Sequence, residues 1–532
     1  MAVALAAAVV LGLGLHEAWV DSPTFDEPVY VSAGLVAVLH HDLTYNDEHP
    51  LLPKVVAVVP VLFTHPVIPS NGRWDGNDER TYSAAFVEAQ LRAGTLRSVT
   101  MASRVLPLLE AIGLAFLLYA LGRDLFGRAA GALAGLLWLL APFVLGLGHL
   151  DSMDVSFALA VGAWSWAMLR WTQRPGTTRA LVVGALSAVA VLTDVTGLLL
   201  AGIAVVAVVA QAWRRSPRAA LAQGGGVALV VWASVWVFYA AFDPGVLLHP
   251  TVVLPLPYLE GMRYLFDNDT IPGPGYLLGV SWTGGRWWYW PGSLLVKTVP
   301  TTLLLLLVGP WGLVGADRAT RRRAGLVLGL PALVLVAFTV GLPRDIGLRY
   351  LLPVIALWLV AASSIVPVLR RHPAGIAVMA VVVVVAGAVT VAASPDSLAW
   401  TTPPFTPAYG AVTNSDVDWG QSLYQLQGWS GDKDPWVAYF GPRGLTASAV
   451  PGARQLLAAH PSQVTGWVAA SATDLTSAER DRLSWLRAYC PVRVLGGTIL
   501  VYRFRTPPSS SPGPSRPVGL CRPGTGFSIR TA

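Results

Sequence analysis

Long apolar runs alternate with short polar connections through the first 394 residues of the chain. A membrane-spanning helix needs about 20 consecutive apolar residues, and eleven runs come near that length. They cover residues 2–20, 101–121, 129–148, 155–172, 179–193, 195–213, 221–242, 294–315, 324–342, 350–369 and 375–394. The pattern predicts a polytopic α-helical membrane protein with about eleven spans, whose transmembrane domain covers residues 1–394.

The pattern changes after residue 394, where the composition becomes that of a soluble domain. Short strand-like runs occur at residues 435–440, 466–471 and 498–504, and one helical stretch lies near 475–489. Residues 395–506 are therefore predicted to form a small α/β domain. Residues 507–532 are rich in Pro, Ser and Gly, which predicts a disordered tail.

The arginines predict the orientation of the spans, because short cytoplasmic loops are enriched in Lys and Arg. One alternate set of connections holds 14 arginines and two acidic residues, Asp124 and Asp317. We expect these connections to be cytoplasmic, with the N-terminus inside and the C-terminal domain extracytoplasmic at the plasma (inner) membrane. The first run lacks a basic start and a clear small-residue cleavage site, so we interpret it as a retained helix; the missing basic start leaves open whether the true N-terminus lies upstream.

Composition and charge exclude several classes of protein. The chain is 54% hydrophobic and 13% charged, against about 25% charged residues in ordinary soluble domains, and these numbers argue against a soluble enzyme. The net charge of +7 arises from the cytoplasmic loops, which removes the case for a nucleic-acid partner. Two cysteines, Cys490 and Cys521, exclude a disulfide scaffold and permit a single disulfide outside the cytoplasm.

The three remaining long segments, 21–100, 243–293 and 395–532, fall on the outer side. Segment 21–100 holds ten acidic and five basic residues. It opens with DSPTFDEPVY, which contains adjacent Asp26 and Glu27, and continues with NDEHPLLPK, which contains His49 and Lys54. Its two apolar stretches, 28–39 and 51–63, are too short to span and are expected to lie along the membrane interface.

Other polar residues gather at the same membrane surface. The second outer connection contains Asp151 and Asp154, and the fourth contains Arg349. Segment 243–293 includes the run WTGGRWWYWPG, which suits either interfacial anchoring or a sugar or lipid platform. A carboxylate at the rim can act as a general base if burial brings its pKa toward the working pH. Lys or Arg at that depth can hold a phosphate.

Each of these residues, considered by itself, also fits a purely structural role. An Asp-Glu pair after a helix is most often a solvated loop, and His49 before a proline is most often a turn residue. Asp154 is placed to cap a helix, and Arg349 is placed to extend to the headgroups. The functional hypothesis depends on their convergence at one face. The acidic loop also permits a divalent cation, with Asp26, Glu27 and Asp154 as candidate ligands.

Several motifs, in order, resemble those of GT-C type membrane glycosyltransferases. The nearest likeness is to bacterial members of family 39, which are protein O-mannosyltransferase-like and related to aminoarabinose transferase. The motifs are FDEP, EHPLLPK, GHLDSMDV, GYLLGVSWTGGRWWYWPGSLLVKTVP, GLRYLLP and NSDVDWGQSL, followed by AYFG, GWVAASAT and ILVYRF. Their succession covers roughly residues 20–505. The sequence departs from the family at Asp194, where many relatives carry Lys, and at Asp416 and Ser422.

The resemblance implies an enzyme that takes a sugar, hexose or pentose, from a polyprenyl-phosphate donor on the outer side of the membrane. It implies transfer to a hydroxyl of a protein, glycan or lipid acceptor with inversion. By position, Asp26 is the expected catalytic base and Glu27 its partner. Asp154, His49 and Asp151 are the expected supporting residues. Lys54, Arg349 and Lys297 are the candidates for binding the donor phosphate.

Two other classes of function compete with the transferase. A lipid or solute transporter or flippase would show paired repeats and polar residues at the membrane midplane, whereas the polar residues here gather at the rim. A non-catalytic assembly or sensor protein would use residues 395–532 to bind a partner. Such a protein is expected to have a degenerate catalytic loop, and here both Asp26 and Glu27 are present.

Overall fold

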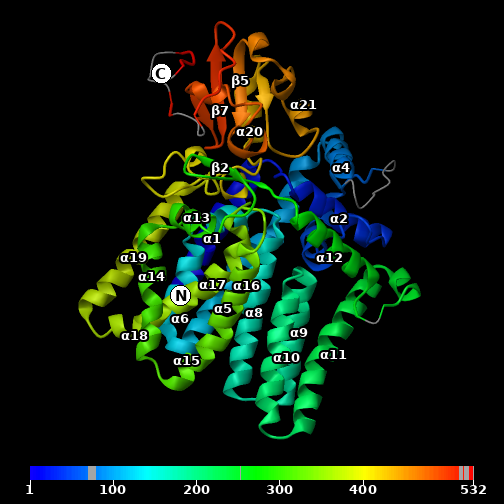
Figure 1. Cartoon of the computed structure of the whole chain (residues 1–532), viewed down its shortest axis with the longest axis vertical. Helices are drawn as coiled ribbons and strands as arrows, with labels where there is room; N and C mark the ends of the chain where they lie inside the picture. The colour runs from blue at the N-terminus through cyan, green and yellow to red at the C-terminus, as the bar shows by residue number, and fades with distance from the viewer. Residues whose placement is uncertain (70–78, 252, 515–518, 521–525, 531–532) are drawn as a thin grey trace.

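The computed structural model describes residues 1–69, 79–251, 253–514, 519–520 and 526–530. A large bundle of helices carries a small β-sheet at one end (Figure 1). The arginine-rich helix α15 (Arg318–Ala324) and the turn between α10 (Gly197–Trp213) and α11 (Pro217–Phe242) lie at the opposite end of the bundle. The chain is thus a multi-pass helical protein with a compact C-terminal sheet, as the sequence pattern predicts.

Each of the eleven apolar runs is helical over most of its length. Among the described residues, six helices are long and apolar enough to cross a membrane, or seven if one bent pair counts as a span. The six cover Ala2–Val20 (α1), Leu96–Phe126 (α5), Pro217–Phe242 (α11), Arg318–Val340 (α15 to α16), Leu348–Leu369 (α17 to α18) and Pro373–Ala393 (α19). The bent pair is α6 (Arg128–Leu139) and α7 (Pro142–Gly148), which meet at 63°.

The other predicted spans correspond to α8 (Met153–Gln173) and to shorter helices. These shorter helices are α9 (Thr177–Thr193), α10 (Gly197–Trp213), α13 (Tyr289–Lys297) and α14 (Pro300–Val308). Prolines account for two of the interruptions, because proline lacks an N–H and disfavours a helical residue before it. Ala141 before Pro142 is extended, and so is Thr298, which ends α13 two residues before Pro300.

The first long loop folds into three helices, α2 (Glu27–His40), α3 (Leu51–Val61) and α4 (Glu79–Ala93). The two apolar stretches expected at the interface are α2 and α3. Proline in the first turn of α2 suits a helix start, since its missing N–H would have no partner there. The two helices cross closely at Gly34, where a Cβ atom would lie 2.5 Å from the carbonyl oxygen of Lys54.

A second long loop contains α12 (Leu256–Asp269) and the hairpin of β1 (Pro274–Leu277) and β2 (Val280–Thr283). The aromatic run at its end packs mostly inward. Trp282 and Trp290 are buried, and the indole N–H of Trp282 donates to Asp345 over 2.8 Å. Trp287 is the exception, with 70% of its surface exposed. The inward rings therefore act as part of the protein core.

The C-terminal sheet has five strands in the order β4-β3-β5-β7-β6. β3 is parallel to both neighbours, and β5, β7 and β6 are antiparallel in turn. The strands are β3 (Trp436–Ala438), β4 (Arg454–Gln455), β5 (Gly466–Ser471), β6 (Arg493–Leu495) and β7 (Ile499–Phe504), with α20 (Leu423–Ser430) and α21 (Leu445–Ala449) beside them. The three predicted strands are confirmed as β3, β5 and β7.

The helical stretch predicted near 475–489 is only partly helical. The chain forms one π-helical turn at Asp474–Ala478 and one 3-10 turn at Leu486–Ala488. The hydroxyls of Thr476 and Ser477 donate to backbone carbonyls four residues earlier. Such side-chain bonds compete with the regular helix.

The predicted disordered tail is also wrong for the described residues 526–530, which pack on the sheet. Ser528 donates its N–H to the carbonyl of Arg503 over 2.8 Å. The N–H of Cys490 donates to the carbonyl of Ile529 over 3.1 Å. Cys490 is disulfide-bonded, and Cys521 lies outside the described residues.

Candidate active site

Two adjoining cavities share four lining residues, and the C-terminal part of the chain contributes to one of them. The first, which we call the polar cavity, has an empty volume of about 850 Å³. Its charged lining residues are Asp26, Glu48, Glu79, Arg80, Arg344 and Arg349, and its aromatic ones include Phe25, Tyr30, Tyr264, Trp419 and Phe440. This lining comes from the first long loop and its helices, from α12, from residues 344–350 and from the C-terminal part of the chain.

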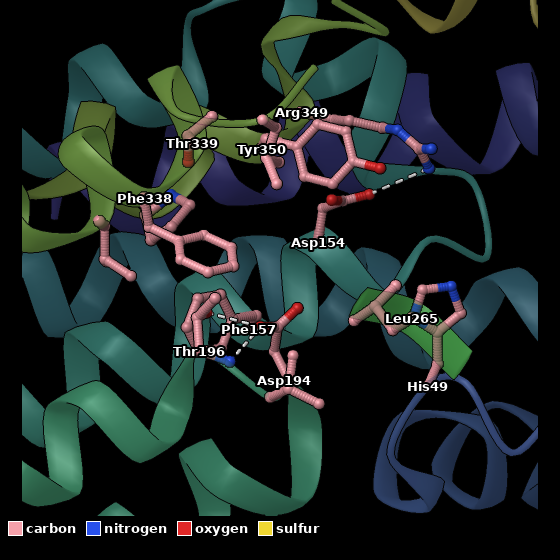
Figure 2. A pocket seen from close by; sticks show the side chains of 14 residues that line it. His49, Asp154, Phe157, Asp194, Thr196, Leu265, Phe338, Thr339, Arg349 and Tyr350 are labelled. Carbon is pink, nitrogen blue, oxygen red and sulfur yellow. Dashed lines mark hydrogen bonds and ion pairs between the residues drawn. The ribbon is translucent and has the colours of Figure 1, made fainter. Parts of the chain in front are cut away.

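The second, which we call the apolar-walled cavity, has an empty volume of about 650 Å³. Its walls come from membrane helices and include Phe157, Leu335, Phe338, Leu342 and Pro353. It shares His49, Leu265, Arg349 and Tyr350 with the polar cavity, so the two meet at Arg349. Figure 2 shows Asp154 and Asp194 pointing into this second cavity, with Arg349 next to Asp154.

Asp26 directly precedes the first residue of α2 and is only 8% exposed. Its Oδ1 lies 2.9 Å from Nη2 of Arg80, and its Oδ2 lies 3.7 Å from Nη1 of Arg349. Burial by itself raises the pKa of Asp26, but the two guanidinium groups outweigh burial and hold the pKa below its usual value. In this structure burial therefore does not bring the pKa of Asp26 toward the working pH, and that condition for a general base is not met by burial alone.

Arg349 lies at the start of the span Leu348–Leu369, where the two cavities meet. Its Nη1 is 3.5 Å from Oδ2 of Asp154 as well as 3.7 Å from Asp26. The guanidinium carbon is 4.4 Å from the ring centre of Trp419 and 5.0 Å from that of Tyr350. Arg349 is thus a fixed cation between two carboxylates, with aromatic rings beside it.

Glu27 follows Asp26 directly but lines neither cavity. Its carboxylate binds Arg104 of α5 with both oxygens, at 2.7 and 2.6 Å. The backbone N–H groups of Thr24 and Asp151 also donate to it, at 2.7 and 2.8 Å. Glu27 is 2% exposed and joins the first loop, α5 and the second outer connection. The geometry makes it a positioning residue and does not support the expected catalytic role.

We expect Glu27→Gln to destabilise the protein by about 3 to 5 kcal/mol, because it leaves the buried Arg104 guanidinium without a counter-ion. Thermal unfolding of the purified protein in detergent measures the loss. Glu88→Gln is the matched control, because Glu88 pairs with Arg92 on an exposed helix face and such pairs contribute about 0 to 1 kcal/mol. Equal melting temperatures for the two variants would contradict the structural role of Glu27.

The three expected supporting residues have different positions. Asp154 points into the apolar-walled cavity and binds Arg349. His49 lines both cavities, and burial, with Lys54 nearby, lowers its pKa to about 4, so its ring is neutral. Asp151 lines neither cavity and contributes its backbone N–H to Glu27. Burial and the Glu27 charge raise the pKa of Asp151 well above its usual value.

The two candidate lysines lie outside both cavity linings, although we expected them to bind the donor phosphate. The ammonium group of Lys54 donates to the carbonyls of Asn46 and His49, the latter over 2.7 Å. That of Lys297 donates to the carbonyls of Leu398 and Trp400, at 2.7 and 2.5 Å. Each lysine is at most 2% exposed. Both therefore hold loop backbone in place, and of the three candidate cations only Arg349 lines the cavities.

Sequence reasoning missed three residues of the site, Arg80, Arg104 and Trp419. Arg104 had a usable signal, because it is a charge near the start of an apolar run and such residues are functional or structural suspects. Trp419 lies in the NSDVDWGQSL motif, whereas Arg80 had no signal beyond residue type. Arg80 stacks on Phe25 at 4.1 Å while it binds Asp26, a contact that only the fold creates.

The proposed metal ligands do not fit a divalent cation. Asp26, Glu27 and Asp154 each already bind a guanidinium group, and Glu27 lies outside the cavities. Within the part of the chain that the structure describes, no group of three or more His, Cys, Asp or Glu side chains is arranged to hold a metal.

One segment of the chain matches a known protein family in sequence. Residues 90–239 match the sequence profile of a family described as dolichyl-phosphate-mannose-protein mannosyltransferase. This match confirms, over that segment, the resemblance that the motifs predict. It contains Arg104, Asp151, Asp154 and Asp194. No curated protein matches the chain at the significance level applied.

Solved structures with a similar chain path include ArnT from Cupriavidus metallidurans. The form bound to undecaprenyl phosphate is 20% identical, with a TM-score of 0.43, and the match covers 76% of this chain and 67% of that one. The apo form is 15% identical, with a TM-score of 0.43 and coverages of 94% and 97%. The Archaeoglobus fulgidus oligosaccharyltransferase in complex with Zn and sulfate is 12% identical, with a TM-score of 0.45 and coverages of 92% and 71%.

Proposed function

We propose that this chain is a membrane glycosyltransferase that moves a sugar from a polyprenyl-phosphate donor to an acceptor hydroxyl, with inversion. The observation that carries the proposal is the placement of Asp26 and Arg349. Both line one polar cavity, which continues into a cavity walled by membrane helices. The matching family profile, whose description names a dolichyl-phosphate-mannose donor, supports the same class of substrate.

The donor binds where the two cavities meet. Its phosphate takes hydrogen bonds from the Arg349 guanidinium, whose planar fork suits phosphate oxygens. The adjoining isoprenyl units lie in the apolar-walled cavity against α16 (Leu330–Val340), which presents Leu335 and Phe338. Asp154 binds the same guanidinium from within that cavity and keeps it in place.

Asp26 accepts the proton of the acceptor hydroxyl. The hydroxyl oxygen attacks the anomeric carbon, the bond from that carbon to the phosphate oxygen breaks, and the proton passes to the carboxylate. Attack from the side opposite the phosphate inverts the anomeric centre. The donor phosphate competes with Asp26 for Arg349, so the pKa of Asp26 rises as the donor binds. Arg349 then stabilises the charge on the departing phosphate.

The reaction takes place on the extracytoplasmic side of the plasma membrane, and the sugar is a hexose or a pentose. The part of the chain that forms the C-terminal sheet contributes Trp419 and Phe440 to the polar cavity, and the sheet lies at one end of the bundle, whereas α15 and the α10–α11 turn, both rich in arginine, lie at the other end (Figure 1). The preference of Lys and Arg for cytoplasmic loops supports this sidedness.

Release of free polyprenyl phosphate tests the proposal against a flippase or a binding protein. The full chain in proteoliposomes is given synthetic polyprenyl-phosphate hexoses and pentoses, together with an extract of cell-envelope acceptors. We expect mass spectrometry to detect polyprenyl phosphate and a glycosylated acceptor for at least one donor. A flippase would move the donor across the bilayer with its sugar still attached. Intact donor throughout the panel would overturn the proposal.

The variant Lys297→Gln tests whether Lys297 binds the donor phosphate. Glutamine can still donate to the carbonyls of Leu398 and Trp400, and position 297 lines neither main cavity. We expect the KM for the donor to stay within about 2-fold of wild type, as for a residue that does not contact the substrate. A KM raised about 10-fold or more at unchanged stability would return Lys297 to the donor site.

A further inference from the structure

A short segment after the last span, residues 414–421, holds the backbone that immediately precedes Arg349. Asp416 accepts the N–H of Leu348 on Oδ1 over 2.7 Å and the hydroxyl of Tyr289 on Oδ2 over 2.8 Å. The hydroxyl of Ser415 donates to the carbonyl of Ile346. The segment therefore fixes the turn from which Arg349 enters the cavities.

The same segment holds the loop that carries Asp26. The N–H of Phe25 donates to the carbonyl of Trp419 over 2.9 Å. The N–H and hydroxyl of Ser22 donate to the carbonyls of Gln421 and Gly420, at 2.8 and 2.9 Å. Gly420 has φ of +92°, a conformation that side chains rarely adopt. The backbone next to Asp26 and the backbone next to Arg349 are thus both hydrogen-bonded to residues 414–421 from the C-terminal part of the protein.

Trp419 stands at the centre of this arrangement. Its side chain is buried, with 2% of the residue exposed, and it lines the polar cavity. The Arg349 guanidinium lies over its ring at 4.4 Å. Stacking uses the flat face of a guanidinium, whereas hydrogen bonds to anions use its edge. A guanidinium on this ring can therefore exchange a carboxylate for a phosphate at its edge and keep its face contact.

We propose that Trp419 is a positioning residue for the donor phosphate, because its indole fixes the plane of Arg349 while its carbonyl holds the Asp26 loop. This inference rests on the proposed function. It makes the segment 414–421 part of the transfer site, so that the C-terminal part of the chain sets donor affinity through Arg349 without touching the sugar.

Binding of polyprenyl phosphate to the full chain in nanodiscs tests the inference, with the lipid phosphate itself as the probe. We expect Trp419→Leu to weaken binding by about 10-fold and Trp419→Phe by about 3-fold, in the range of a desolvated cation–π contact. Trp467→Leu is the matched control, because Trp467 stacks on Arg503 at 4.5 Å and lines neither cavity. We expect its affinity to equal that of wild type.

A double-mutant cycle separates positioning from general support of the fold. In an Arg349→Gln background, Trp419→Leu is expected to cause no further loss of binding, because the contact is already gone. In the transfer assay the single variant is expected to raise the KM for the donor more than it lowers kcat. If Trp419→Leu does not fold, the same cycle is run with Trp419→Phe.

The outcomes are distinct. Wild-type affinity in Trp419→Leu, or in a folded Trp419→Phe, overturns the inference alone. An equal loss in the wild-type and Arg349→Gln backgrounds also overturns it, because the tryptophan would then act independently of Arg349. Absence of polyprenyl phosphate binding by the wild-type chain overturns the proposed donor class, and the inference with it.

Discussion

Asp26→Asn is expected to lower sugar transfer by about 10²- to 10⁴-fold, the usual contribution of a general base. The asparagine cannot take the proton of the acceptor hydroxyl. Binding of the donor should stay the same or become tighter, because the substitution frees Arg80 and Arg349 from a competing carboxylate. Initial rates of transfer and the affinity for polyprenyl phosphate, measured on the same preparation, check both halves of the prediction.

Asp151→Asn is the matched control for this variant. Asp151 is also a buried acid beside the first loop, but it lines neither cavity and its pKa is raised well above the usual value by burial and by Glu27. These effects favour the neutral form of its side chain, and asparagine is uncharged and similar in shape. We expect near wild-type transfer. Wild-type transfer by Asp26→Asn would instead remove Asp26 from the mechanism.

Arg349→Gln is expected to weaken donor binding by about 100-fold, because one or two charge-assisted hydrogen bonds to phosphate are worth roughly 1.5 to 3 kcal/mol each. The KM for the donor in the transfer assay measures this loss. Arg344→Gln is the control, because Arg344 lines the polar cavity but uses its guanidinium on the backbone of Asn268 and Ile271. An unchanged KM in Arg349→Gln would exclude Arg349 as the phosphate ligand.

The same variant makes a prediction about pH. Arg80 and Arg349 together lower the pKa of Asp26, so loss of Arg349 raises that pKa toward its usual value. The base must be ionised to accept a proton, and activity is therefore lost as the pH falls through the pKa of Asp26. We expect the acid side of the profile of kcat/KM to move to higher pH in Arg349→Gln. The Arg344→Gln profile should keep its position.

The ends of the apolar runs were enough to place Asp26, Asp154 and Arg349 at one membrane surface, because the length of a span fixes which residues emerge together. The ends of the runs did not indicate that the side chains of Asp26 and Glu27 point in different directions. Consecutive residues at a helix start point about 100° apart, so one carboxylate enters the cavity and the other turns into the protein toward Arg104. The same limit applies to Lys54 and Lys297, because hydropathy indicates the depth of a residue in the membrane but not the direction of its side chain.

Hydropathy also identifies the apolar runs but does not locate the bends within them. The runs predicted as spans 129–148 and 294–315 are interrupted at Pro142 and near Pro300, where a proline-imposed break matters more than composition. The contact between Trp419 and the Asp26 loop joins residues 394 positions apart, as the bond from Phe25 to Trp419 shows. No local pattern encodes such a pairing, so the contribution of the C-terminal part to the site emerged only from the fold.

A structure of the full chain with polyprenyl phosphate bound is the most direct test of the claim that one cavity joins the donor phosphate to the base. We expect the phosphate within hydrogen-bonding distance of Arg349, at about 2.7 to 2.9 Å. We expect the first isoprenyl units along Phe338 and Leu335, and the Asp26 carboxylate facing open space beside the phosphate. A phosphate bound at Lys54 or Lys297, or bound away from Asp26, would contradict the claim.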